Sequence, residues 1–256
     1  MAGEGIRTVW DDIKAVLELT PDELGVLRKK DVLPLFDVWR RYGLPRFDLA
    51  LAWNIAKGRS PYVFIVGEPM SGKTTFGVYA GLRFSLDEFV PEEAYYAGGV
   101  EEFLADFIER KKFAKSSIVI DEGEEELDKW WSELVKLLRL VHDLRGLHRR
   151  NAFFIIAPDI LEFATKLRRM NGAFMVKVVD WGEARTYVIR KDPADISSSA
   201  GARRYLLDGH YEYAKPPSKV MKRIYELSRQ RKEKIVEETW RRYKEKKLRK
   251  EEAIEF

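Results

Sequence analysis

One octapeptide constrains the fold of this 256-residue chain more than any other segment. Residues 67–74 read G-E-P-M-S-G-K-T and directly follow an apolar run at 62–66, which predicts a buried β-strand. The two glycines let the backbone bend so that successive N–H groups point inward at an anion. Residues 75–82 predict a helix whose N-terminal dipole adds positive potential at the same place. We therefore expect a strand–loop–helix unit that binds phosphate groups.

The polar side chains of this loop indicate a nucleoside triphosphate, and ATP with Mg²⁺ is the expected ligand. Lys73 would reach the β- and γ-phosphates, which makes it a candidate catalytic residue, and the Thr74 hydroxyl would hold Mg²⁺. The residues expected to bind the nucleotide are Gly67, Glu68, Pro69, Met70, Ser71, Gly72, Lys73, Thr74 and Thr75. The alternative is a chance glycine-rich turn, which the flanking strand and helix argue against.

A second run, Ser117 followed by the apolar residues 118–120, ends in the acids Asp121 and Glu122. A carboxylate at the tip of a buried strand orients Mg²⁺ through its water shell, so Asp121 joins Thr74 as a predicted metal-site residue. Glu122 is then the candidate general base, which positions the water that attacks the γ-phosphate. The alternative for Glu122 is a solvated loop acid, because three further glutamates follow at 124–126.

Two arginines, Arg149 and Arg150, close a basic turn before the apolar run at 152–157. An arginine in this position would reach the γ-phosphate of a neighbouring subunit and stabilise transition-state charge, so both are candidate catalytic residues. Arg168 and Arg169 are second candidates. The alternative is a solvated basic turn, or one that pairs with acids nearby.

The alternation of apolar runs and helical stretches predicts an α/β domain with a mostly parallel central sheet. Residues 174–190, which turn at Trp181-Gly182-Glu183, predict a β-hairpin on this sheet. The expected segments are a helical part at 1–60, the α/β core at 61–191, a loop-rich connector at 192–217 and a charged helical tail at 218–256.

Two helices are predicted in the first of these segments. Thr20-Pro21-Asp22-Glu23 has the form of a capping box that begins a helix. A second helix is predicted at 35–42, ending at Gly43. We expect its apolar face to pack on the core, with a partner-binding surface as the alternative. The residues spaced for that face are Leu33, Phe36, Trp39 and Tyr42.

The composition narrows the class of protein further. Charged residues make up 34% of the chain, whereas glutamine occurs once and asparagine three times, a balance typical of heat-loving organisms. The chain has no cysteine for disulfides, three scattered histidines, and no apolar run of the roughly 20 residues that a membrane-spanning helix needs. The N-terminus lacks a signal-peptide pattern, so we expect a soluble, cytoplasmic protein.

The basic excess is concentrated near the C-terminus. From Lys215 onward, 15 Lys and Arg residues stand against 8 Glu. Such a stretch suits a nucleic acid or a docking partner. A charged, solvated helix of a thermophilic protein is an equally simple explanation, because the glutamates interleave throughout.

The motifs together resemble those of the FtsK–HerA class of DNA-pumping P-loop ATPases, most closely the small archaeal viral and plasmid versions that package or transfer DNA. The resemblance spans Pro61 to Arg190 and rests on residues 67–75, 118–122 and 145–150 and on the strand that ends in Ala157-Pro158. The chain departs from the class at Ala157-Pro158-Asp159, where a polar sensor, often Gln, usually stands.

The resemblance implies a RecA-like P-loop NTPase fold of the additional-strand type, with helical N- and C-terminal appendages. It also implies a homo-oligomer, typically a hexameric ring, with ATP at the subunit interfaces and DNA through the centre.

These features predict an ATP-hydrolysing DNA motor for translocation, packaging or transfer, from a hyperthermophilic archaeon or its virus or plasmid. The closest alternative is an AAA-type replication initiator or helicase loader, which would carry a small helical bundle after the last strand. A second alternative is an ATP-dependent switch or adaptor with negligible hydrolysis. A kinase shares the loop but lacks a hydrolytic glutamate beside the Mg²⁺-orienting aspartate.

Overall fold

A seven-stranded sheet forms the centre of the computed structural model, which describes residues 6–97, 102–103, 105–106, 109, 117–121, 150–156, 173–190 and 203–252. The strands are β1 (Tyr62–Val66), β2 (Tyr95–Tyr96), β3 (Ile118–Asp121), β4 (Phe153–Ile156), β5 (Phe174–Asp180), β6 (Glu183–Arg190) and β7 (Arg203–Glu212). They lie in the order β2-β3-β4-β1-β5-β6-β7. The first five in this order are parallel, and β5, β6 and β7 pair antiparallel. The predicted α/β class with a mostly parallel sheet is confirmed.

The central strands β1 and β4 are apolar and lie in the core. All four residues of β4 are buried, as are four of the five residues of β1. In the register of the sheet, Ile155 of β4 lies between Phe64 of β1 and Ile120 of β3. The carboxyl ends of these parallel strands therefore meet at one edge, which brings the loop after β1 close to Asp121.

The predicted hairpin is confirmed by β5 and β6, which turn at Trp181 and Gly182. Gly182 has a φ of +86°, in the left-handed region that favours glycine.

The expectation of a loop-rich connector at 192–217 was wrong for residues 203–212, which form β7 against β6. As the outer strand of the sheet, β7 buries few side chains, with Tyr211 buried and Tyr205 and Leu206 exposed. It therefore lacks the apolar pattern by which an inner strand is recognised.

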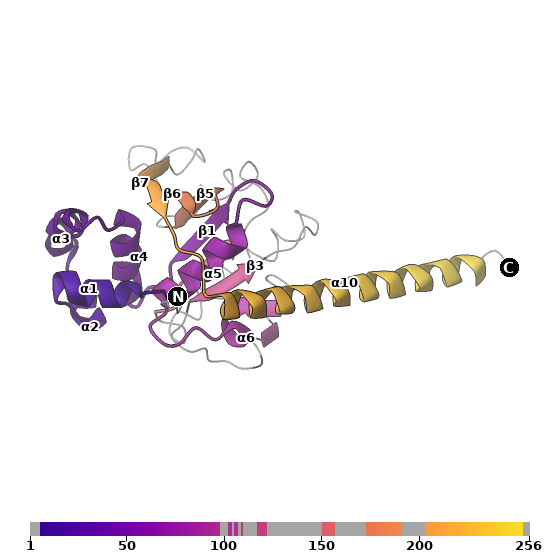
Figure 1. Cartoon of the computed structure of the whole chain (residues 1–256). Helices are drawn as coiled ribbons and strands as arrows, with labels where there is room; N and C mark the ends of the chain where they lie inside the picture. The colour runs from indigo at the N-terminus through magenta and orange to yellow at the C-terminus, as the bar shows by residue number, and fades with distance from the viewer. Residues whose placement is uncertain are drawn as a thin grey trace, which may run out of the picture.

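Four helices precede the sheet: α1 (Val9–Leu17), α2 (Pro21–Val26), α3 (Lys29–Arg41) and α4 (Arg46–Ala56). The capping box at the start of α2 is confirmed, since the Glu23 backbone N–H donates to Thr20 Oγ1 (3.3 Å) and the Thr20 N–H donates to Glu23 Oε2 (2.8 Å). Figure 1 shows α1–α4 gathered on one side of the sheet.

The predicted apolar face of α3 was only partly right. The helix begins at Lys29, before the predicted start, and ends at Arg41 just before Gly43. Trp39 is fully buried and its indole N–H donates to the Pro45 carbonyl (2.8 Å), but Leu33 and Tyr42 are exposed. Val32 is buried and its neighbour Leu33 is not. The side of α3 that contacts α4 is therefore shifted by about one residue from the predicted apolar face.

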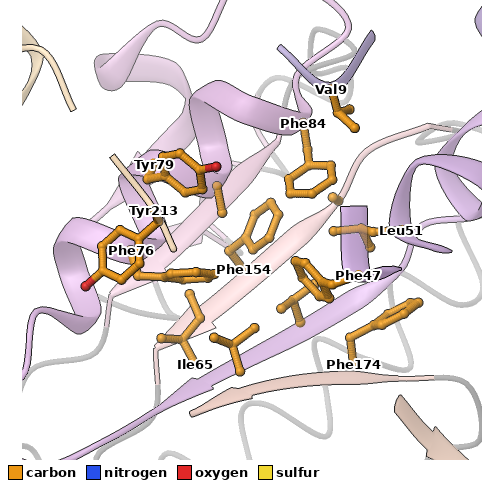
Figure 2. Packing of buried hydrophobic residues seen from close by; sticks show 14 of the residues in the cluster. Val9, Phe47, Leu51, Ile65, Phe76, Tyr79, Phe84, Phe154, Phe174 and Tyr213 are labelled. Atoms are coloured by element: carbon orange, nitrogen blue, oxygen red, sulfur yellow. The ribbon is translucent and has the colours of Figure 1, made fainter. Parts of the chain in front are cut away.

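Two further helices, α5 (Lys73–Phe84) and α6 (Pro91–Ala94), follow β1. In the core, α5 packs on the sheet, with the ring of Phe84 at 5.9 Å from that of Phe154 (Figure 2). On its other side Phe84 meets Phe47 of α4 at 5.7 Å, so the N-terminal helices share one core with the sheet. The position of α5 matters for the site because its N-terminus begins at the glycine-rich loop.

The chain ends in a 35-residue helix, α10 (Ser218–Glu252). Its first turns pack on the body through the buried Met221 and Ile224, and Arg223 pairs with Glu92 of α6. Beyond these turns the helix extends away from the rest of the chain (Figure 1). Among the described residues, no helix has both the length and the apolarity needed to cross a membrane.

Candidate nucleotide site

The glycine-rich loop connects the end of β1 to the start of α5, as the sequence predicts. Gly72 is the N-cap residue of α5 and has a φ of +95°, and Met70 also adopts a positive φ of 62°. A Cβ on Gly67 would lie 2.7 Å from both Ser71 Oγ and the Val178 carbonyl oxygen, so no side chain fits there. The loop therefore turns tightly at positions where a side chain at Gly67 or a right-handed conformation at Gly72 would not fit.

Lys73 bridges the beginning of the loop. Its Nζ donates to the Gly67 carbonyl (2.8 Å) and to the Glu68 carbonyl (2.9 Å). Partial burial lowers the pKa of Lys73, an effect that the negative charges of Asp121 and Glu68 oppose. The ammonium group is therefore held inside the loop at a cost in solvation, which a bound anion would relieve.

The buried hydroxyl of Ser71 is a further feature of the loop. It has no hydrogen-bond partner among the described residues. A buried hydroxyl without a partner is unfavourable unless a ligand supplies one, so this group also fits an anion site.

Asp121 and the loop meet through one carboxylate oxygen. The Thr74 hydroxyl donates to Asp121 Oδ2 (2.8 Å), and the Tyr95 hydroxyl donates to the same oxygen (2.7 Å). Burial, together with the charge of Asp121, raises the pKa of Tyr95, which stays a neutral donor. Two hydroxyls and a carboxylate form an oxygen-only cluster of the kind that Mg²⁺ prefers.

This cluster is too small to hold a metal ion by itself. In the described ranges there is no group of three or more His, Cys, Asp or Glu residues that would ligate a cation. A magnesium ion at Thr74 and Asp121 would therefore need phosphate oxygens and water to complete its coordination, which is how Mg²⁺ is usually bound with nucleotides.

The opposite side of the loop contacts the β5–β6 turn. The indole N–H of Trp181 donates to the Met70 carbonyl (3.1 Å). A Cβ on Gly72 would come within 3.0 Å of the Tyr213 hydroxyl and 3.5 Å of the Trp181 ring. Trp181 in the β5–β6 turn and Tyr213 directly after β7 thus contact the loop from the side of the antiparallel strands.

Sequence reasoning missed Tyr95, Trp181 and Tyr213 as members of the site. The one usable signal was positional. Trp181 stands in the predicted turn after β5, and turns at the carboxyl ends of strands beside β1 lie near the loop.

Some of the predicted site residues lie together in the structure and others do not. The nine loop residues and Asp121 are brought together as expected, whereas Glu122 and Arg149 lie outside the described residues, as do Arg168, Arg169 and the 157–159 segment. Arg150 precedes β4 at the opposite end of the sheet, where it pairs with Asp22 of α2. It therefore does not contact the loop of its own chain, and pairing with a nearby acid, the alternative for this turn, holds for Arg150.

The far end of α5 is fixed by a buried ion-pair network. Arg83 pairs with Asp12 of α1 (2.5 Å) and with Asp48 of α4 (2.7 Å). The Tyr211 hydroxyl of β7 donates to the other oxygen of Asp48 (2.7 Å). Although burial disfavours its charge, the adjacent Asp48 raises the pKa of Arg83, which stays protonated.

No protein-family model matches the chain, and no curated protein matches its sequence. The case for a function therefore rests on the residues and geometry described above.

Proposed function

We propose that this protein is a Mg²⁺-dependent P-loop ATPase. The observation that carries the proposal is the 2.8 Å hydrogen bond between Thr74 Oγ1 and Asp121 Oδ2. It joins the threonine of a G-x-x-x-x-G-K-T loop to an acid on a separate strand, and these are the two residue types that hold the metal in P-loop sites. A glycine-rich turn without a ligand-binding role is not expected to place its threonine against an acid at the end of a neighbouring strand.

The residues of the loop have separate tasks in this proposal. The backbone N–H groups of residues 67–75 and the α5 N-terminus bind the phosphates. Lys73 exchanges its two carbonyl partners for phosphate oxygens. Thr74 and Asp121 hold Mg²⁺, which when bound neutralises phosphate charge. Tyr95 keeps the Asp121 carboxylate oriented through its hydrogen bond.

Hydrolysis needs a base for the attacking water. Glu122 follows the Mg²⁺-orienting Asp121 directly in the chain, so we assign the role of general base to it. Arg149 remains our candidate for an arginine that reaches the γ-phosphate of a neighbouring subunit.

The strand order supports a RecA-like fold of the additional-strand type. In β2-β3-β4-β1-β5, the strand β4 is inserted between the loop strand β1 and the Asp121 strand β3. Within P-loop proteins this insertion is what the resemblance to the FtsK–HerA class implies. We therefore propose an ATP-driven DNA motor that works as a ring-shaped homo-oligomer.

The C-terminal region distinguishes this proposal from an AAA-type initiator or loader. That class would carry a small helical bundle after the last strand. The chain instead continues from β7 into α10, a single helix of 35 residues. A switch or adaptor would hydrolyse ATP negligibly, so measured ATP turnover distinguishes it from the motor and from the AAA-type class.

The proposal is tested by ATP turnover with and without double-stranded DNA. Lys73→Ala is expected to abolish nucleotide binding, and Glu122→Gln to keep binding while reducing turnover by at least about a hundredfold, the low end for loss of a general base. Glu124→Gln is the matched control, because it removes one acid of the same run and should leave turnover unchanged.

Three outcomes would contradict parts of the proposal. Wild-type turnover in Glu122→Gln removes this residue as the base. Turnover that does not respond to DNA contradicts the motor, and ATP binding without measurable turnover favours the switch.

A further inference from the structure

An open cleft of about 510 Å³ lies between the β5–β6 turn and the beginning of α10. Its lining combines two aromatic rings with basic side chains and one acid. These side chains belong to Trp181, Lys215, Lys222, Tyr225, Glu226 and Arg229. Its volume is within the range of small-molecule sites.

The cleft adjoins the phosphate-binding loop through Trp181. This indole both lines the cleft and donates its N–H to the Met70 carbonyl at 3.1 Å. The same ring lies 3.5 Å from the position that a Cβ on Gly72 would take. A ligand that extended from the loop toward β5 would therefore reach this ring first.

The sheet order fixes which end of a nucleotide would enter the cleft. Asp121 lies on β3, on one side of β1, whereas Trp181 follows β5 on the other side. The terminal phosphates and the metal belong beside Thr74 and Asp121. The opposite side of the loop, where Trp181 lies, is then the side available to the nucleoside end.

The side chains of the cleft suit a heteroaromatic ring with attached phosphates. Trp181 and Tyr225 are about half exposed, at 56% and 52%, so their rings are available for stacking. Lys215 and Lys222 give the cleft a basic excess, because Glu226 accepts a hydrogen bond from Arg223 (3.2 Å) and Arg229 pairs with Glu233 (3.6 Å).

We propose that this cleft binds the base and ribose of the nucleotide whose phosphates occupy the loop. Trp181 and Tyr225 stack on the base, and Lys215 and Lys222 attract the negative charge of the attached phosphates. This inference rests on the proposed ATP site and assigns residues that the phosphate-binding motif does not contain.

The experiment compares ATP with inorganic tripolyphosphate, a probe that has the phosphates but no base. Binding of each to the full-length protein is measured by calorimetry in the presence of Mg²⁺. Tyr225→Ala should weaken ATP binding about tenfold, in the range measured for base–aromatic stacking, and leave tripolyphosphate binding within about twofold. Trp181→Ala removes both a stacking ring and the hydrogen bond to Met70, so it should weaken ATP binding about tenfold more than it weakens tripolyphosphate binding. Trp181→Phe, which keeps an aromatic ring, should bind ATP close to normally.

Two controls separate this inference from the proposed function. Trp240→Ala removes an exposed tryptophan that lies on α10 outside the cleft, and it should change neither affinity. Lys73→Ala should lose both ligands. If the wild-type protein binds neither ligand, the proposed ATP site itself fails.

Other results overturn the base site alone. Unchanged ATP affinity in Trp181→Ala or in Tyr225→Ala excludes the cleft as the binding place of the base. Equal weakening of ATP and tripolyphosphate by Trp181→Ala would mean that Trp181 supports the loop through Met70 and does not contact the base.

Discussion

A single carboxylate oxygen, Oδ2 of Asp121, accepts hydrogen bonds from two hydroxyls that come from different parts of the chain. Thr74 lies in the first turn of α5, and Tyr95 lies on the short strand β2 beside β3. Tyr95 is almost completely buried, so its hydroxyl has little freedom to move. The orientation of Asp121 is thus fixed from both sides before any ligand binds, which reduces the reorganisation needed to hold a metal.

Tyr95→Phe removes one of these donors and leaves the ring in place. Because a hydrogen bond to a charged group contributes about 1.5–3 kcal/mol, we expect the Mg²⁺ concentration for half-maximal ATP turnover to rise about tenfold. The measurement is a Mg²⁺ titration of turnover at saturating ATP. Tyr96→Phe is the matched control, since the Tyr96 hydroxyl lies within hydrogen-bond distance of the Asp106 carboxylate (2.6 Å) and the Glu93 backbone carbonyl (3.1 Å) and not of Asp121. An unchanged titration in Tyr95→Phe would contradict the positioning role.

At the scale of elements, Asp208 connects β7 to two other parts of the fold. Its oxygens accept hydrogen bonds from the backbone N–H groups of Arg46 and Phe47 at the start of α4, both at 2.9 Å. The Thr186 hydroxyl of β6 donates to the same carboxylate (2.8 Å). The helix N-terminus is thus capped from a strand about 160 residues away in sequence.

These contacts explain why β7 was not predictable. The elements that carry a regular apolar pattern, such as β1, β4 and the β5–β6 hairpin, could be located from the sequence. The pattern of β7 is that of an exposed edge, and the contacts of Asp208 with α4 and Thr186 are made only in the folded chain. No local window of sequence contains them.

Asp208→Ala should destabilise the protein by about 1–2 kcal/mol, the usual cost of losing a helix N-cap. Urea unfolding followed by circular dichroism measures this change. Asp37→Ala provides the comparison, because Asp37 is an exposed acid on α3 and its loss should change the free energy of unfolding by no more than about 0.5 kcal/mol. Equal stability of the two variants would show that Asp208 is not an effective cap.

At the scale of the whole molecule, the Arg83 network ties the N-terminal helices to the element that carries the loop. Arg83 lies in the last turn of α5 and contacts Asp12 of α1 and Asp48 of α4. Tyr211 adds β7 to the same cluster. The helix α5 therefore connects the glycine-rich loop at its N-terminal end to α1 and α4 at its C-terminal end.

Arg83→Met should destabilise the protein by about 3–5 kcal/mol, because it leaves the buried carboxylate of Asp48 without its counter-charge, whereas Asp12 keeps its ion pair with Arg7 (2.9 Å). The midpoint of urea unfolding tests this. Arg41→Met replaces an exposed arginine at the end of α3 and should have an effect within about 0.5 kcal/mol. If both variants unfold at the wild-type midpoint, the network does not hold the helices to the core.

The site was predictable where its residues form a motif and was not where they are recruited by packing. Lys73, Thr74 and Asp121 belong to patterns with fixed chemistry, and the parallel strand order brings them together. Tyr95 and Trp181 contribute through hydrogen bonds whose partners lie 26 and 111 residues away. A single sequence gives no direct signal for such distances.

The long helix α10 has a mechanical consequence. Its first turns line the cleft next to the loop, whereas the part after Arg229 extends from the body for 23 further residues, or roughly 35 Å at 1.5 Å per residue. A rigid rod of that length is a lever arm, so a rotation of about 10° at the cleft moves its tip by roughly 6 Å. The stacked rings of Trp240 and Tyr243 lie on the far part of this arm, where the displacement is large.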